Sequence, residues 1–340
     1  MTREHLEPAP PPSLAATLPR DAAEAQRAAA RAGAAGAAGR LEVQRAGSAG
    51  ALLRSMRPRQ WPKNALVFAA PTAAGVMTHA GALGRTVASL GIFIAASACV
   101  YLVNDVVDKA SDQLHPLKRR RPIASGQVTT RQAIVAAVVL GAGALGASVP
   151  LAGSLVGIVA AYLAISIAYS LRLKHVPIVE LACVGSGFML RAIAGGAATH
   201  VPISPWFLVM TSFGALFVVA GKRTTEQQVL GEGQGGHRVA LTAYPPEFLR
   251  GVRRLAMSIT VMTYCLWALE RASHLHPAGH APNLVWFELS IVPFVLAVLG
   301  VELAVLKGRG GEPEELVMSD RLLQMAGLAW LALVLIGIYG

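Results

Sequence analysis

Three aspartates at short spacing stand at the end of an apolar stretch: Asp105, Asp108 and Asp112, within the run NDVVDKASD. On a single helix, positions i, i+3 and i+7 put all three carboxylates on one face. Like charges held this close repel one another unless a cation lies among them. Carboxylate oxygens suit Mg²⁺, and Mn²⁺ as well. The spacing therefore predicts a metal site with these three residues as ligands.

A basic run begins six positions after Asp112, with Lys118 and three arginines that end at Arg121. Arginine and lysine beside metal-binding carboxylates provide the charge neutralisation and paired donors that a diphosphate needs. We therefore expect Lys118 and Arg121 to bind a diphosphate. For Arg119 and Arg120 taken singly, an ordinary cluster of basic residues at a membrane surface is the stronger interpretation.

The elements that position these residues follow from composition. The 340 residues are 54% hydrophobic and 14% charged, whereas soluble domains carry about 25% charged residues. This excludes a soluble enzyme and predicts an all-α polytopic membrane protein. The net charge of +11 fits basic cytoplasmic loops and anionic membrane lipids. We expect no nucleic acid partner, because no aromatic stacking platform accompanies the basic residues.

Nine apolar segments, each near the ~20 residues that cross a bilayer, predict nine transmembrane helices. They are 65–82, 84–103, 132–149, 152–170, 178–198, 203–221, 255–271, 284–306 and 322–339. After residue 50, lysine and arginine concentrate in alternate loops, and the opposite set of loops holds only Arg85 and Arg271. The asymmetry predicts a cytoplasmic N-terminus and a cytoplasmic polar site in a multi-pass plasma-membrane protein.

Residues 1–50, rich in Ala, Gly, Pro and Arg, are expected to form a disordered cytoplasmic tail. Residues 51–340 are expected to form the membrane domain. Asp320, just before the last apolar segment, is expected to cap its helix. Arg191 falls deep in the fifth segment, where a charge is costly and suggests function. A structural role for Arg191 is an almost equal alternative.

Further motifs complete a pattern that resembles the UbiA superfamily of intramembrane prenyltransferases over residues 50–340. The motifs are RPRQWPKN at 57–64, NDVVDKASD at 104–112, RPIASG at 121–126, YSLRLKHVPIVE at 169–180 and GKRTTE at 221–226. The combination is similar to one branch, the decaprenyl-phosphate phosphoribosyltransferases of actinobacterial cell-wall synthesis. One departure from other members favours this branch: the segment 169–180 lacks the second aspartate-rich motif.

The resemblance implies a UbiA-like helix bundle with its active site at the cytoplasmic end. It implies transfer of a phosphoribosyl group from phosphoribosyl diphosphate to a polyprenyl phosphate, with release of diphosphate, for arabinan precursors. The expected catalytic residues are Asp105, Asp108, Asp112, Lys174 and Tyr169, and the three aspartates hold Mg²⁺. The expected substrate-binding residues are Arg59, Lys63, Asn64, Asn104, Lys118, Arg121, Glu180, Arg191, Lys222 and Arg223.

Several alternatives stay open at this stage. Lys63, Asn64 and Arg59 could bind either the sugar donor or the lipid phosphate, and Glu180 could bind ribose hydroxyls or orient Lys174. A prenyltransferase that uses a prenyl diphosphate shares the fold and the first motif, and a membrane transporter or scaffold is a third possibility. The expected partners are phosphoribosyl diphosphate, polyprenyl phosphate, membrane lipids and further copies of the chain in a homo-oligomer.

Overall fold

The computed structural model describes residues 49–230, 243–274, 284–311 and 313–340, and the compact unit Ala51–Gly340 holds nearly all of them. The predicted tail of residues 1–50 lies almost wholly outside this described part. The described residues form helices and turns and contain no strand, which confirms the all-helical prediction. The long helices are α3 (Ala80–Val107), α5 (Thr130–Ser148), α6 (Gly153–Leu171), α7 (Val179–Thr199), α8 (Pro205–Leu230), α10 (Pro246–His274), α11 (Leu284–Leu306) and α13 (Arg321–Tyr339).

Seven of the described helices are long and apolar enough to cross a membrane, namely α3, α5, α6, α7, α8, α11 and α13. The predicted segment 255–271 lies within α10, which has 29 residues but is not among the seven. Its first turns carry Arg250, Arg253 and Arg254, which lower the mean hydropathy of the helix. The chain is a multi-pass membrane protein, but the predicted count of nine spans is not confirmed.

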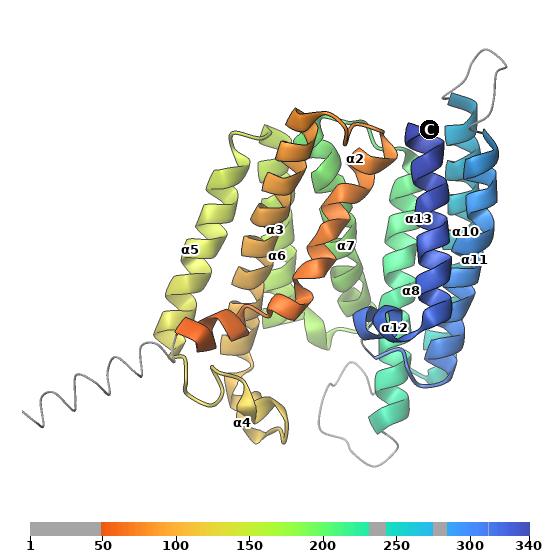
Figure 1. The fold of residues 1–340 in the computed structure, drawn as a ribbon. Helices are drawn as coiled ribbons and strands as arrows, with labels where there is room; N and C mark the ends of the chain where they lie inside the picture. The colour runs from red at the N-terminus through yellow and green to blue at the C-terminus, as the bar shows by residue number, and fades with distance from the viewer. Residues whose placement is uncertain (1–48, 231–242, 275–283, 312) are drawn as a thin grey trace, which may run out of the picture. The chain divides into compact units, whose positions relative to one another are not determined.

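The first predicted segment, 65–82, is not one α-helix. It is divided between a 3₁₀ helix, η1 (Pro58–Phe68), the short α2 (Ala69–Ala73) and the start of α3. Pro62 lies inside η1 and Pro71 inside α2, and proline lacks the N–H that α-helical hydrogen bonding requires. Nevertheless, η1 and α2 run beside α3 and α7 (Figure 1).

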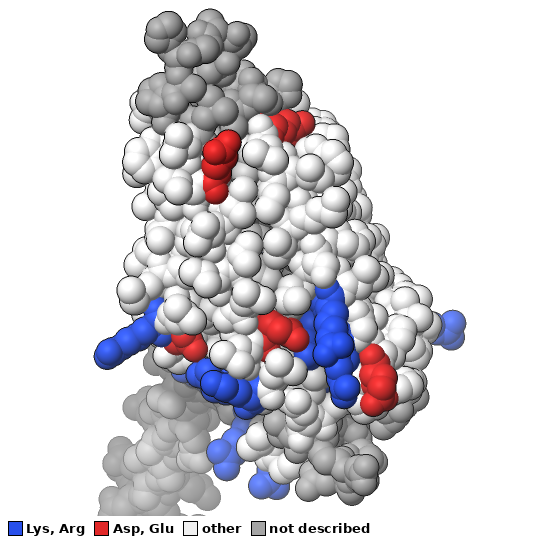
Figure 2. Space-filling model, turned by 90° about the vertical axis from the view of Figure 1, so that its right-hand side faces the viewer, with Lys and Arg blue, Asp and Glu red and all other residues white. Residues whose placement is uncertain are grey.

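Successive long helices run in opposite directions, so the loops rich in lysine and arginine meet at one end of the bundle (Figure 1). This end, called the basic end below, carries α4 (Lys109–Leu114), η2 (Lys118–Arg120), η3 (Leu173–His175) and α12 (Pro313–Ser319). Figure 2 shows the consequence on one face, where lysines and arginines gather toward the lower part and uncharged residues cover the middle. The loops predicted to be rich in lysine and arginine therefore lie together at one end of the helix bundle.

A close backbone contact joins η1 to the bundle. A Cβ atom on Gly195 of α7 would lie 1.8 Å from the carbonyl oxygen of Val67, so only glycine permits this approach. On the other side of η1, Val67 is part of a core with Phe93, Leu102 and Leu155. Because η1 is held from both sides, the residues at its start are positioned at the basic end.

Side-chain caps start two of the long helices. Thr129 and Gln132 form a reciprocal capping box at the start of α5. The carboxylate of Asp320 accepts hydrogen bonds from the backbone N–H groups of Leu322 and Leu323, which confirms the cap predicted for α13.

Candidate active site

The aspartate-rich segment is split between two helices. Helix α3 ends at Val107, Asp108 is its C-terminal cap, and α4 begins at Lys109. The expectation that one continuous helix displays all three carboxylates is therefore wrong. Asp105 and Asp112 are each 3% exposed, and burial at this level requires that a carboxylate be paired.

Arg121 joins the two buried carboxylates. Its Nη1 lies 2.6 Å from Oδ2 of Asp112 and 3.3 Å from Oδ1 of Asp105. Arg57 adds a second guanidinium, with Nη2 at 2.5 Å from the same oxygen of Asp105. Two carboxylates from separate helices thus contact one guanidinium group. The acidic and basic runs of the sequence therefore lie together, as predicted.

Asp108 has different partners. Its Oδ1 accepts a hydrogen bond from Lys174 of η3, and its Oδ2 accepts one from the amide of Asn104 at 3.2 Å. Lys174 follows α6, far from the aspartates in the sequence, so the fold itself brings these charges together. This contact places Lys174, predicted to be catalytic, directly on the aspartate-rich segment.

Glu180 and Arg223 form a buried ion pair between α7 and α8. The guanidinium binds both carboxylate oxygens of Glu180, at 2.9 and 2.8 Å, and Nη1 of Arg223 lies 2.7 Å from Glu226. Because a bidentate pair fixes both side chains, the geometry favours a positioning role for Glu180. A bond to ribose hydroxyls would have to compete with Arg223.

The residue before α7 is strained. Ile178 has φ of 67°, a value that is a genuine outlier for a β-branched residue. The hydroxyl of Tyr244 accepts a hydrogen bond from the backbone N–H of Ile178 at 2.6 Å. Burial raises the pKa of the Tyr244 phenol, against the opposing effect of the Ile178 N–H, so this hydroxyl stays protonated at neutral pH. This strained turn connects Lys174 to Glu180.

Arg191 lies apart from the aspartates, between α7 and η1. Its Nε donates to Oδ1 of Asn64 at 2.7 Å, its Nη1 to the carbonyl of Gly187 at 2.7 Å, and its Nη2 to the hydroxyl of Tyr162 at 2.9 Å. Asn64 in turn donates to Ser97 of α3 at 3.2 Å. These contacts favour the structural alternative for Arg191, and they place Asn64 in the same network.

The remaining predicted residues lie on the elements that meet at the basic end. Arg59 is exposed, whereas Arg57, which was not among the predicted site residues, contacts Asp105. The shared motif RPRQ contained both arginines, and only the turn at Arg57, with φ of 54°, directs that side chain to the carboxylate. Four further predicted residues are half-buried, namely Lys63 on η1, Lys118 on η2, Tyr169 on α6 and Lys222 on α8.

The carboxylates suit a divalent cation by chemistry and in part by geometry. Asp105 and Asp112 already share a single cationic nitrogen, and their hard oxygen atoms are the ligands that Mg²⁺ prefers. Within the described ranges, no three acidic, histidine or cysteine side chains are already grouped around one point, because Asp108 is turned toward Lys174. A metal held by all three aspartates would share Asp108 with Lys174.

Comparison with known proteins agrees with this arrangement. Residues 65–328 match the UbiA prenyltransferase family. The chain belongs to the UbiA prenyltransferase family. The resemblance carried by the five sequence motifs is thereby confirmed, since these motifs fall in or next to the matched range.

Several relatives of this UbiA family protein bear the name decaprenyl-phosphate phosphoribosyltransferase. The one from Mycobacterium tuberculosis is 42% identical over 287 residues, which cover 83% of this chain and 92% of the relative. The one from Corynebacterium glutamicum is 39% identical over 295 residues, which cover 85% of this chain and 86% of the relative.

Solved structures show the same fold. A UbiA homolog from Archaeoglobus fulgidus, solved with DMAPP and Mg²⁺ bound, superposes with a TM-score of 0.63. The match covers 84% of this chain and 97% of the homolog at 18% identity. This likeness confirms the UbiA-like bundle for this UbiA family protein.

Proposed function

We propose that this protein transfers the 5-phosphoribosyl group of phosphoribosyl diphosphate to a polyprenyl phosphate and releases diphosphate. The contact between Lys174 and Asp108 carries the proposal. It places a lysine, in the segment where other members have a second aspartate-rich motif, against the first such motif. A donor with a third phosphate at the ribose 5-position needs cations there, whereas a prenyl diphosphate would need a second metal.

The difficult step of the reaction is the departure of diphosphate from C1 of ribose, and no strong base is needed. The acceptor phosphate is already an anion, so one of its oxygen atoms forms the new bond to C1 without proton removal. The old bond between C1 and the diphosphate oxygen breaks, and its electron pair leaves with diphosphate. In-line displacement inverts the configuration at C1.

The cationic side chains stabilise the charge that develops on the leaving group. Arg57 and Arg121 stand at the buried carboxylates, and Lys118 lies half-buried on the adjacent η2. Donors that are already in place when charge develops lower the barrier without reorganisation. We assign the diphosphate to these three residues.

The ribose 5-phosphate is assigned to the side formed by η3 and α8. Lys174 and Lys222 supply positive charge there, and Tyr169 near the end of α6 is assigned to the same side. The buried pair of Glu180 and Arg223 holds α7 and α8 together behind this side. Lys63, on η1, is assigned to the phosphate of the lipid acceptor.

The proposed metal is Mg²⁺, with Asp105, Asp108 and Asp112 as its ligands and Asn104 as a supporting hydrogen-bond donor to Asp108. When bound, the ion supplies positive charge that stabilises the departing diphosphate. The relation to a homolog solved with Mg²⁺ and the oxygen chemistry of the aspartates support this choice, and Mn²⁺ would suit the same ligands.

The proposed location is the plasma membrane, with the basic end in the cytoplasm. Phosphoribosyl diphosphate is soluble and highly charged, whereas the polyprenyl chain needs lipid. A site at the end of the bundle lets both phosphate groups meet at the membrane surface while the lipid tail stays in the bilayer.

The decisive experiment measures transfer of radiolabel from phosphoribosyl diphosphate into the organic phase. The purified full-length protein is incubated in detergent with Mg²⁺ and a polyprenyl phosphate, and EDTA, Asp108→Asn and Glu247→Gln serve as comparisons. Glu247 is an exposed carboxylate at the same end, so its variant controls for loss of one negative charge. We expect labelled lipid with wild type and Glu247→Gln, and none with EDTA or Asp108→Asn.

A second arm replaces the donor with a labelled prenyl diphosphate and an aromatic acceptor. Transfer in this arm alone would contradict the proposal and assign the protein to the ordinary prenyltransferases. No transfer in either arm, from protein whose folding is verified by its thermal transition, would also contradict it.

A further inference from the structure

A second cavity lies at the basic end, beside α8. It is a pocket of about 510 Å³ between α8, α10 and the end of α11, within the size range of small-ligand sites. Its principal lining residues are Thr224, Gln228, Arg250, Arg253, Arg254 and Leu306. None of them belongs to the aspartate-rich centre described above.

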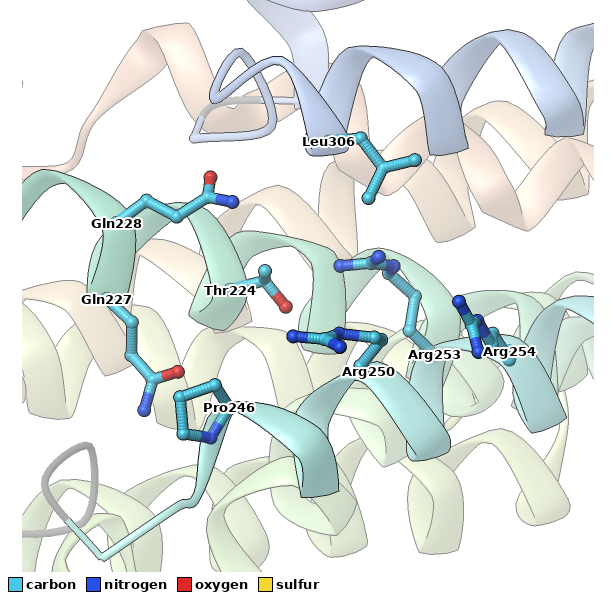
Figure 3. A pocket seen from close by; sticks show the side chains of 8 residues that line it. All are labelled: Thr224, Gln227, Gln228, Pro246, Arg250, Arg253, Arg254 and Leu306. Atoms are coloured by element: carbon cyan, nitrogen blue, oxygen red, sulfur yellow. The ribbon is translucent and has the colours of Figure 1, made fainter.

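Three arginines share one face of α10. Arg250, Arg253 and Arg254 are spaced i, i+3 and i+4, which brings like charges side by side on the helix and destabilises it. Figure 3 shows the guanidinium groups of Arg250 and Arg253 directed from α10 toward Thr224 on α8, with Arg254 one turn further along. An anion bound beside these arginines would reduce the repulsion between them.

Two glutamates neutralise part of this charge: Oε2 of Glu302 lies 2.7 Å from Nε of Arg253, and Glu247 lies 3.9 Å from Nη2 of Arg250. Nη2 of Arg253 donates to Oε1 of Glu302 at 2.9 Å, yet Nη1 of Arg253 has no hydrogen-bond partner among the described residues. Arg253 is only 1% exposed, and a buried donor of this kind costs free energy until it is satisfied. A ligand oxygen in the pocket would satisfy it.

We propose that this pocket binds a phosphate group. Guanidinium groups bind phosphate oxygens in paired, charge-assisted hydrogen bonds, and three arginines against two glutamates leave a surplus of positive charge. The group can come from an anionic lipid headgroup or from free phosphate. Basic pockets between transmembrane helices commonly hold lipid headgroups, and the exposed Leu306 and Leu255 beside the arginines suit acyl chains.

The test uses the full-length protein in a neutral detergent and follows its thermal unfolding midpoint. One arm titrates inorganic phosphate at constant ionic strength. The other adds short-chain phosphatidylglycerol, compared with phosphatidylcholine of the same chain length. The variant Arg250→Gln/Arg254→Gln removes two exposed arginines and leaves the buried Arg253 in place, so that folding is preserved. Arg131→Gln, at an exposed position of α5 on the same end, is the matched control.

We expect saturable stabilisation in at least one arm, with an apparent Kd that rises roughly tenfold or more in the double variant, the scale of one charge-assisted contact. Arg131→Gln should match wild type. A response to phosphatidylglycerol alone identifies a headgroup, and a response to inorganic phosphate identifies the free ion as sufficient. The proposal is overturned if neither probe stabilises the wild type, if the double variant keeps the wild-type affinity, or if Arg131→Gln loses as much affinity.

Discussion

Lys174 donates a hydrogen bond to Asp108 across 66 residues of sequence. The contact joins the segment after α6 to the break between α3 and α4, and both partners are partly shielded from water. An ion pair in such surroundings is screened less than one on an open surface. It is the point where the aspartate-rich segment meets a lysine from the segment after α6.

Replacement of Lys174 by methionine should lower the transfer rate about 100-fold, the scale found when one preorganised charge at a reacting centre is removed. The measurement is the initial rate of label transfer at saturating substrates. Arg172→Met is the control, because Arg172 is an exposed cation in the same turn and should retain its rate. A wild-type rate in Lys174→Met would contradict the proposed role.

Asp112→Asn should raise the Mg²⁺ concentration needed for half-maximal activity about tenfold. The substitution removes one of two carboxylates that converge on Arg121, and loss of one charged ligand weakens binding of a hard cation. Mg²⁺ titrations of the initial rate test this, with Glu247→Gln as the control. An unchanged Mg²⁺ requirement would remove Asp112 from the metal site.

Ile178→Gly should stabilise the protein by about 0.5–1 kcal/mol. Glycine adopts positive φ without strain, and the gain exceeds the extra chain entropy that glycine loses on folding. Ile178 is 60% exposed, so little packing is lost. Unfolding in mixed micelles provides the measurement. Val176→Gly, at an exposed site with φ of −100°, should instead destabilise the protein. Equal effects of the two variants would contradict the interpretation that the backbone at Ile178 is strained.

Gly195→Ala should destabilise by roughly 2 kcal/mol or more and lower activity. Its new methyl would meet the Val67 carbonyl at 1.8 Å, so η1 must move away from α7, and overpacking of this kind is costly. The movement would displace Arg57 at the start of η1. Thermal unfolding and the transfer assay report the two effects.

Gly185→Ala is the matched control for this prediction. It lies on the same helix, and nothing stands within 4 Å of an added Cβ. Helix propensity alone should then make this variant neutral or slightly more stable. Similar losses in both variants would show that the close approach of η1 is not the cause.

Some predicted site residues have protein partners that the sequence did not indicate. Arg191 and Asn64, predicted to bind substrate, bond each other between α7 and η1, and their substrate role stays a prediction. Arg59 was predicted to bind substrate and is exposed, whereas Arg57 contacts Asp105. For these residues the sequence identified the type of side chain but not the direction in which it points. That direction depends on the backbone turn at Arg57 and on the helix that packs against η1.

The sequence by itself determined the all-helical membrane class, the division of charge between two ends, the Asp320 cap and the family. These properties depend on composition, on local hydrogen bonding and on motifs that are contiguous in the chain. Only the tertiary structure decided that Arg121 bridges two carboxylates, that Lys174 reaches Asp108 and that η1 replaces an ordinary first helix. Such pairings join distant segments, and packing against neighbours, rather than local propensity, selects them.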